Sequence, residues 1–556
     1  MAEEEKKTSV YLTYSEEEKK ELEALNAGYR DFLSRCKTER ESVQEAVHQA
    51  EAAGYRDLAG LIEGGERLQP GDKVYAVNMK KAIVLFQIGE APLADGMNIL
   101  GAHIDTCSLD VKQNPLYEDG GLAYLDTHYY GGIKKYQWTA LPLALHGVVV
   151  KKDGTVVDIC IGESEDDPVF CVTDLLIHLS QEQMKKTGAK VVEGEDLDIL
   201  VGNYPLKKED KESVKAGVLA LIEQKYGFAE EDFQSAELRL VPAGKARELG
   251  FDRSMTLAYG QDDRVCAYTS LRAMLENTST RRTSCCLLVD KEEIGSVGAT
   301  GMQSRFFENT VAELLRLVTG TESDLALRRC LANCKMLSSD VSSAYDALYA
   351  SAYDKKNVAY LGRGMVFNKF TGARGKSGSN DANAEYLGEL RRILEAKGVR
   401  YQLAELMRLV TGTESDLALR RCLANCKMLS SDVSSAYDAL YASAYDKKNV
   451  AYLGRGMVFN KFTGARGKSG SNDANAEYLG EIRHILDERH VRYQLAELGK
   501  VDLGGGGTIA YIMSLYGMQV IDSGVGVLSM HAPWEATSKV DVYETKKGYM
   551  AFLELA

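Results

Sequence analysis

The sequence predicts an α/β fold in which an open mixed sheet, flanked by helices, is interrupted by a β-rich insertion. Short apolar segments such as Leu287–Val289 have the length of buried strands and end in polar residues. Residues 15–64 have a helical pattern, with Ser15 as a candidate N-cap. From about 107 to 248 short strands and glycine turns replace these patterns. We therefore expect one α/β domain split by a second domain.

Further strands are predicted by alternating or continuous apolar residues. Lys73–Ile88 alternates and is rich in β-branched and aromatic residues, which favours a pair of strands. Leu145–Val150 and Val156–Ile161 flank Lys152-Asp153-Gly154 and predict a hairpin in the insertion. A helix is expected over Phe306–Leu317. The expected domains are 1–106 and 249–556 for the two parts of the α/β domain, and 107–248 for the β-rich one.

Length and charge limit the possible functions. A chain of 556 residues is too long for one core, which agrees with at least two domains. The net charge of −14 argues against nucleic acid or an anionic membrane as the main partner. The polar N-terminus resembles no targeting signal, and the eleven cysteines form no metal-binding or disulfide framework. A cytoplasmic protein with reduced thiols is expected.

Acidic residues follow one predicted strand directly. Glu292 and Glu293 come after Leu287–Val289, and Gly295 opens the next loop. Neighbouring side chains of an extended chain point to opposite faces. One carboxylate could thus bind a metal while the other handles a proton, although a lone pair of this kind is more often a solvated turn.

Histidine and aspartate end other strands. Asn98–Thr106 is an apolar strand ending in His103-Ile-Asp105, whose imidazole could bind a metal while the carboxylate orients it. An ordinary half-buried histidine is an equal alternative. Asp262 precedes a helical segment and could either cap that helix or bridge two cations with its two oxygens. A last apolar strand, Val525–Met530, is followed by His531.

The chain contains a long exact repeat. Residues 316–389 recur unchanged as 408–481, 92 positions later, and weaker similarity extends the copies to 312–403 and 404–495. Two perfect copies do not form a solenoid, and they indicate a recent tandem duplication or a join between two closely related coding sequences. Each copy carries Leu-Ser-Ser-Asp-Val, so that Asp340 and Asp432 are equivalent strand-end carboxylates.

Together these strand ends offer two histidines and three carboxylates, a ligand set that suits a pair of divalent cations. Glu292 is left over as a general base. The four glycines Gly504–Gly507 do not match a dinucleotide-binding pattern, so a tight turn or a close approach to a bound peptide remains for them.

The motifs Gly-Ala-His103-Ile-Asp105-Thr, Gln-Asp262-Asp-Arg, Lys-Glu292-Glu293-Ile-Gly, Ser-Ser-Asp340 and Leu-Ser-Met-His531 resemble those of the M18 metalloaminopeptidases, relatives of aspartyl aminopeptidase. The resemblance covers nearly the whole chain apart from one repeat unit, whose removal leaves 464 residues. It implies a dinuclear metallopeptidase domain and a β-rich dimerisation domain. Two zinc ions, or cobalt or manganese, and dimers assembled into a tetrahedral dodecamer are also implied.

Carried over to this chain, the resemblance gives each residue a role. His103 and Glu293 would bind different metals, Asp262 would bridge them, and His531 with Asp340 or Asp432 would complete the site. The candidate catalytic residues are Glu292, which would act as general base for a metal-activated water, and Asp105, which would orient the site. The substrates would be peptides that lose their N-terminal residue, with acidic residues as a candidate preference.

The residues leave open two alternative functions and the choice between two possible metal ligands. The duplication could produce an inactive, metal-stabilised assembly protein, and a two-metal site could instead serve an amide deacylase. Because the copies are identical, local propensity does not choose between Asp340 and Asp432. We expect one of them to bind metal while the spare unit is extruded from the sheet.

Overall fold

The structure is a computed structural model in which the larger part of the chain is described. The described residues are 9–206, 211–278, 281–350, 353–363, 365–368, 378–396, 401–404, 426–436, 446–460, 464–465, 470–475, 479, 482–483, 485–487, 489–495, 505–506 and 518–553.

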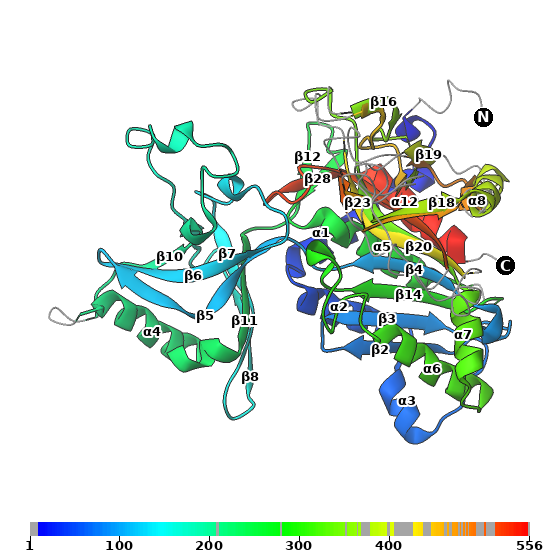
Figure 1. The fold of residues 1–556 in the computed structure, drawn as a ribbon, viewed down its shortest axis with the longest axis horizontal. Coiled ribbons are helices and arrows are strands. Elements are labelled where there is room, and N and C mark those ends of the chain that lie inside the picture. Colours follow the sequence, from blue (N-terminus) through cyan, green and yellow to red (C-terminus); the bar gives the residue numbers. More distant parts are fainter. Residues whose placement is uncertain are drawn as a thin grey trace.

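Two sheets organise the chain, and they lie on opposite sides of the molecule (Figure 1). The larger sheet has fifteen strands among the described residues. Its central path consists of β2 (Lys73–Asn78), β3 (Ala82–Gln87), β14 (Ser284–Val289), β4 (Asn98–His103), β15 (Lys335–Ser343), β20 (Cys426–Ser435) and β27 (Met518–Leu528). The others are β1 (Arg56–Asp57), β12 (Arg247–Leu249), β13 (Met255–Ala258), β17 (Met365–Asn368), β19 (Tyr401–Ala404), β22 (Met457–Asn460), β25 (Tyr493–Leu495) and β28 (Glu535–Ser538). This arrangement confirms the predicted mixed α/β fold.

The apolar run of β14 is buried on both faces, as a central strand requires. Cys285, Leu287 and Val289 belong to one hydrophobic core, and Cys286 and Leu288 to the other. The first core is shared with the helices α3 (Leu58–Gly64), α6 (Phe306–Thr319) and α7 (Asp324–Ala332). The second is shared with α1 (Glu16–Arg35), α2 (Glu39–Ala52), α5 (Gln261–Glu276) and α12 (Lys539–Leu553). Helices therefore cover both faces of the sheet.

The N-terminal helical region is divided, although the pattern of residues 15–64 predicted one continuous helical segment. Ser15 caps α1 as expected. A second capping box follows at Thr38, which accepts the N–H of Glu41 while the Glu41 side chain accepts that of Thr38. Since such a box satisfies backbone groups at a helix start, it begins a new helix.

The second sheet has seven strands, and their order is β8-β7-β11-β5-β6-β10-β9. They are β5 (Ser108–Asp119), β6 (Leu122–Tyr130), β7 (Leu143–Val150), β8 (Val156–Ile161), β9 (Cys171–Val172), β10 (Ile199–Gly202) and β11 (Ala236–Pro242). The predicted hairpin is β7 with β8, and α4 (Ser213–Tyr226) packs against the same core. This sheet stands on the left of Figure 1, away from the larger one.

A buried histidine joins the two parts. His146 on β7 has its Nδ1 2.8 Å from Glu41 Oε1 of α2 and its Nε2 3.2 Å from Glu163 Oε1. Burial lowers the pKa of His146, but hydrogen bonds with Cys160 and then Glu163 outweigh it and raise the pKa to about 11. The imidazolium is therefore the stable form in the folded protein.

Stability should fall as the pH rises because of this histidine. A raised folded-state pKa adds stability that is complete below the ordinary value of 6.5 and is lost as the pH approaches about 11. The slope is at most about 1.4 kcal/mol per pH unit. We expect the difference in unfolding free energy between wild type and His146→Gln, measured in urea, to shrink over this range. Burial lowers the pKa of neighbouring Lys37 to about 8, so its contribution to stability changes with pH in the opposite direction. Lys37 is present in both proteins, so the difference in unfolding free energy between them removes its contribution. A pH-independent difference would contradict the prediction.

The two repeat copies lie against each other and against the same partners. Strands of both copies belong to the larger sheet, so the prediction that the spare unit is extruded is wrong for the described strands. β15 and β20 pair in parallel with Asp340 opposite Asp432, and each also pairs with β4 and β27. Figure 1 shows β20 beside β4 in the layer between α5 and β14. Parallel pairing of the copies also forms two small sheets, β16 (Tyr353–Val358) with β21 (Asp446–Asn449) and β18 (Gly378–Asn383) with β24 (Gly470–Asn475). Helix α8 (Ala384–Ala396) follows β18.

Further along the sequence, equivalent side chains of the two copies lie at nearly the same position. The rings of Tyr360 and Tyr452 are stacked with centroids 2.7 Å apart, closer than the roughly 3.5 Å of optimal carbon contact. The Sδ atoms of Met365 and Met457 each lie 2.7 Å from the place that a Cβ on Gly548 would take. Identical sequences fit identical surroundings, so the fold offers one docking position to two segments.

Two other features complete the fold. Gly505–Gly506 forms strand β26, paired with β23 (Gly464–Ala465), while the flanking residues 504 and 507–517 lie outside the described residues. Among the helices that the structure describes, none has the length and apolar character needed to cross a membrane.

Candidate metal centre

Parallel strands bring the first site residues to one edge of the larger sheet. β4 and β14 pair in parallel, and His103 lies opposite Val289 at their carboxyl ends. Ligand sites in open α/β sheets form at this edge. β15 is parallel to β4 as well and carries Asp340, but it continues to Ser343 and does not end at the aspartate as the sequence suggested.

Three of the predicted ligands form a buried group. His103, Asp262 and Asp340 each offer one ligand atom, and these atoms lie within 4.8 Å of one another. His103 Nε2 is 3.5 Å from Asp262 Oδ1. All three side chains are at most 5% exposed. The Asp432 side chain lies outside the described residues, and only its backbone is placed beside Asp340.

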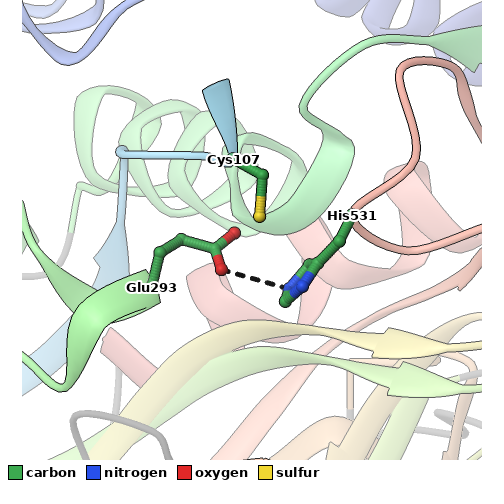
Figure 2. A group of neighbouring side chains, drawn as sticks. All are labelled: Cys107, Glu293 and His531. Carbon is green, nitrogen blue, oxygen red and sulfur yellow. Dashed lines mark ion pairs between the residues drawn. The ribbon is translucent and has the colours of Figure 1, made fainter. Parts of the chain in front are cut away.

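A second group lies next to the first. His531 Nε2 is 3.2 Å from Glu293 Oε2 and 3.2 Å from Asp262 Oδ2. Cys107 joins Glu293 and His531, with ligand atoms again within 4.8 Å (Figure 2). The cysteine was not among the predicted site residues, although it comes only two residues after Asp105.

Asp262 connects the two groups, because its Oδ1 faces His103 and its Oδ2 faces His531. Glu535 fixes this arrangement: its carboxylate accepts the backbone N–H of Asp262 at 3.0 Å and that of His531 at 2.7 Å. Burial raises the pKa of Glu535 to about 8. No role was predicted for Glu535. Asp262 is far away in the sequence, and both partners of the carboxylate are backbone N–H groups, which no sequence pattern reveals.

Asp105 organises the other side of the site. Its carboxylate accepts the N–H groups of Glu292 at 3.1 Å and Glu293 at 3.2 Å, and its Oδ1 is 3.3 Å from His103 Nδ1. Burial raises the pKa of Asp105, but the hydrogen bond and charge of His103 outweigh it and hold the pKa below its ordinary value. The carboxylate is thus suited to orient His103 and both glutamates.

The seven-stranded sheet also contributes to the site through the end of β6. Tyr130 Oη donates to Asp105 Oδ2 at 2.7 Å. The Gly132 carbonyl is 2.9 Å from His531 Nδ1. A hydrogen bond from Nδ1–H to a carbonyl leaves Nε2 free as a ligand. Neither residue was predicted, because nothing local in the sequence relates them to the metal-type ligands.

Glu292 and Glu293 are placed by a turn, although the sequence predicted an extended strand end. β14 ends at Val289, and Glu292–Ile294 forms one turn of 3₁₀ helix between Lys291 and Gly295, which both have positive φ. The glutamates still diverge: Glu293 faces His531, while Glu292 Oε2 lies 3.8 Å from His103 Nε2.

The buried carboxylates of the site favour the binding of cations. Burial raises the pKa of Glu293 to about 7 and holds those of Glu292 and Asp340 well above the ordinary values. Glu293 Oε1 is buried without a hydrogen-bond partner among the described residues. Buried carboxylates in such a cluster are costly unless they are paired or coordinate metals. The donors therefore fit divalent cations of the zinc type.

The comparisons with known proteins agree with this chemistry. A family model described as "Aminopeptidase I zinc metalloprotease (M18)" matches residues 32–408 and 398–553. The first matched range contains the copy 312–403 and the second contains the copy 404–495, as expected if the family has a single such segment. A probable M18 family aminopeptidase 1 of Clostridium acetobutylicum is 49% identical over 541 residues, which covers 97% of this chain and 96% of the relative.

Solved structures give the same result. An M18 aminopeptidase from Thermotoga maritima is similar with a TM-score of 0.78 and 35% identity, over 98% of this chain and 99% of that one. Aminopeptidase I from C. acetobutylicum is similar with a TM-score of 0.76 and 46% identity, over 98% of each chain. The chain belongs to the M18 family of zinc metalloproteases and is a metal-dependent aminopeptidase.

Proposed function

We propose that this aminopeptidase works with two divalent ions, most simply zinc, with cobalt or manganese as substitutes. One ion would be held by His103 and Asp340, the other by Glu293 and His531, and Asp262 would bind both. The observation that carries the proposal is the position of Asp262, whose two carboxylate oxygens face different histidines at 3.5 and 3.2 Å. The ligand pairs 3.2 Å apart match the roughly 3.3 Å between neighbouring ligands of a tetrahedral ion.

Glu292 is the general base of the proposed mechanism. When bound, the cations polarise the scissile carbonyl and stabilise the charge that develops on its oxygen. The Glu292 carboxylate takes a proton from the attacking water and passes it to the leaving amine. The N–H groups that Asp105 holds fix the turn carrying Glu292 and Glu293, so that one glutamate stays free of the ligand set.

Metal dependence and substrate class can be tested together. The protein is stripped with a chelator and titrated with zinc or cobalt while release of p-nitroaniline is followed. Aspartyl, glutamyl, alanyl and leucyl anilides are compared, because the resemblance to aspartyl aminopeptidase suggests acidic substrates. We expect activity to disappear without metal and to return fully at two ions per chain.

The matched control is an N-acetylated anilide, which lacks the free amine and should not be cleaved. Loss of its acetyl group, detected by mass spectrometry as acetate and the free aminoacyl anilide, would instead indicate an amide deacylase. Full activity at one ion per chain would contradict the two-ion proposal. A folded protein that binds two ions and cleaves no substrate would be the inactive assembly protein considered as an alternative.

We further propose that the segment 107–248 is a dimerisation domain and that dimers assemble into a tetrahedral dodecamer. Between residues 175 and 179 of this segment, four large apolar side chains are between 47% and 68% exposed, which favours burial against another chain. They are Leu175, Leu176, Ile177 and Leu179. The solved structure of yeast mApe1, which is 18% identical with a TM-score of 0.60, is that of a dodecamer.

A cytoplasmic location is proposed as well. All the cysteines that the structure describes are free thiols, and most are buried. Free thiols without disulfides are typical of reducing compartments.

A further inference from the structure

Cys107 lies inside the second ligand group, where no role has been assigned to it. Its side chain is 1% exposed. Its Sγ, the Glu293 carboxylate and the His531 imidazole converge within 4.8 Å, and Figure 2 shows the three side chains pointing toward one another. The cysteine therefore lies beside the two predicted ligands.

The surrounding chain keeps the thiol in this place. The Cys107 carbonyl accepts the Tyr259 hydroxyl at 2.7 Å, which holds the backbone. Gly131 approaches from β6, and a Cβ there would lie 2.6 Å from Cys107 Sγ and 3.1 Å from Glu293 Oε2. Gly131 also has a φ of 78°, a conformation that favours glycine. Glycine at this position leaves the space in which sulfur and carboxylate come together.

With Cys107, four donor side chains are available at this position. Glu293, His531 and the shared Asp262 supply one imidazole and two carboxylates, and zinc takes four ligands in a tetrahedral arrangement. A thiolate is a softer ligand than oxygen and favours zinc over manganese. When the thiol binds a cation, it releases its proton to solvent and one sulfur–metal bond forms.

We propose that Cys107 is a fourth protein ligand of the ion held by Glu293, His531 and Asp262. The inference rests on the proposed two-ion centre and adds a difference between its two positions. The ion at Cys107 has four protein ligands, one of them sulfur, and is the more tightly held. The ion at His103 and Asp340 has three protein ligands, including the shared Asp262, and keeps its fourth position open for substrate.

Cobalt spectroscopy tests the proposal without relying on activity. Metal-free full-length protein is loaded with two Co²⁺ per chain, and the near-ultraviolet sulfur-to-cobalt charge-transfer band is recorded together with the visible d–d bands. We expect the charge-transfer band in wild type and its loss in Cys107→Ala and Cys107→Ser, with the d–d bands kept. Cys286→Ala is the matched control, since Cys286 is equally buried in β14, and should keep both. Two bound cobalt ions without the band in wild type, or a band that survives in Cys107→Ala, would overturn the proposal.

X-ray absorption at the zinc edge of wild type answers the same question if the variants do not fold. We expect a sulfur neighbour at about 2.3 Å in addition to nitrogen and oxygen at about 2.0–2.1 Å. Two zinc ions bound by nitrogen and oxygen alone would refute the thiolate and leave the two-ion centre intact. A protein that binds fewer than two ions would refute the centre itself, and the inference with it.

Discussion

Replacing Glu292 with glutamine is expected to lower kcat by about 10²- to 10⁴-fold, the usual contribution of a general base. Glutamine has the size and shape of glutamate but does not accept the proton of the attacking water. Glu292 lies beside the ligand set and not within either group, with its Oε2 3.8 Å from His103 Nε2. KM and metal content should therefore stay close to their wild-type values. Steady-state kinetics on an aminoacyl anilide and metal analysis check both expectations.

The matched control is Glu308→Gln on α6, where the carboxylate pairs with Arg305 at the surface and lies outside both ligand groups. It should leave kcat unchanged. If Glu292→Gln loses an ion, Glu292 is a ligand, and if it keeps more than about a tenth of wild-type kcat, it is not the general base.

Asp340→Asn should release one of the two ions and reduce activity to less than about one tenth, whereas Asp432→Asn should change neither. The reason is positional. The Asp340 carboxylate lies within ligand distance of His103 and Asp262, and Asp432 is its neighbour on the next strand. Metal content per folded chain and kcat measure the difference. Equal, partial losses in the two variants would contradict a unique ligand and indicate that either copy can dock.

Excision of one copy supplies the control for this comparison. Removing 404–495 leaves 464 residues and Asp340 as the only candidate from the repeat. This shorter chain should keep its metal and activity, and Asp340→Asn within it should abolish both. It should also aggregate less, since the spare strands no longer compete for pairing positions. A shorter chain that does not fold would show that the second copy is needed for the structure.

Local patterns identified most of the ligand set, because strand ends are recorded in the sequence itself. His103 and Glu293 each follow an apolar run that has the pattern of a buried strand, and parallel pairing then brings those ends to one edge. The second helix start was also recorded, as the capping box of Thr38 and Glu41, but the longer helical pattern concealed it. A turn at Glu292 was one of two interpretations of the sequence, but its 3₁₀ form was not predicted, since a three-residue 3₁₀ helix has no periodicity to detect.

Contacts between distant segments could not be predicted in this way. Tyr130 and Gly132 reach Asp105 and His531 from the other sheet, and Glu535 links Asp262 to His531. Each is an ordinary residue in its own segment, and its role appears only when the chain is folded.

Motifs and strand patterns are local properties, so the family, the fold class and the kinds of side chain that could bind metal were predictable from the amino-acid sequence alone. The folding of distant segments places Asp262 so that it faces both histidines, and it brings the side chains of Cys107 and Asp340 close to the predicted ligands. The repeat shows the reason: two identical segments have identical propensities, and β15 and β20 both pair with β4 and β27, so local sequence does not choose between them.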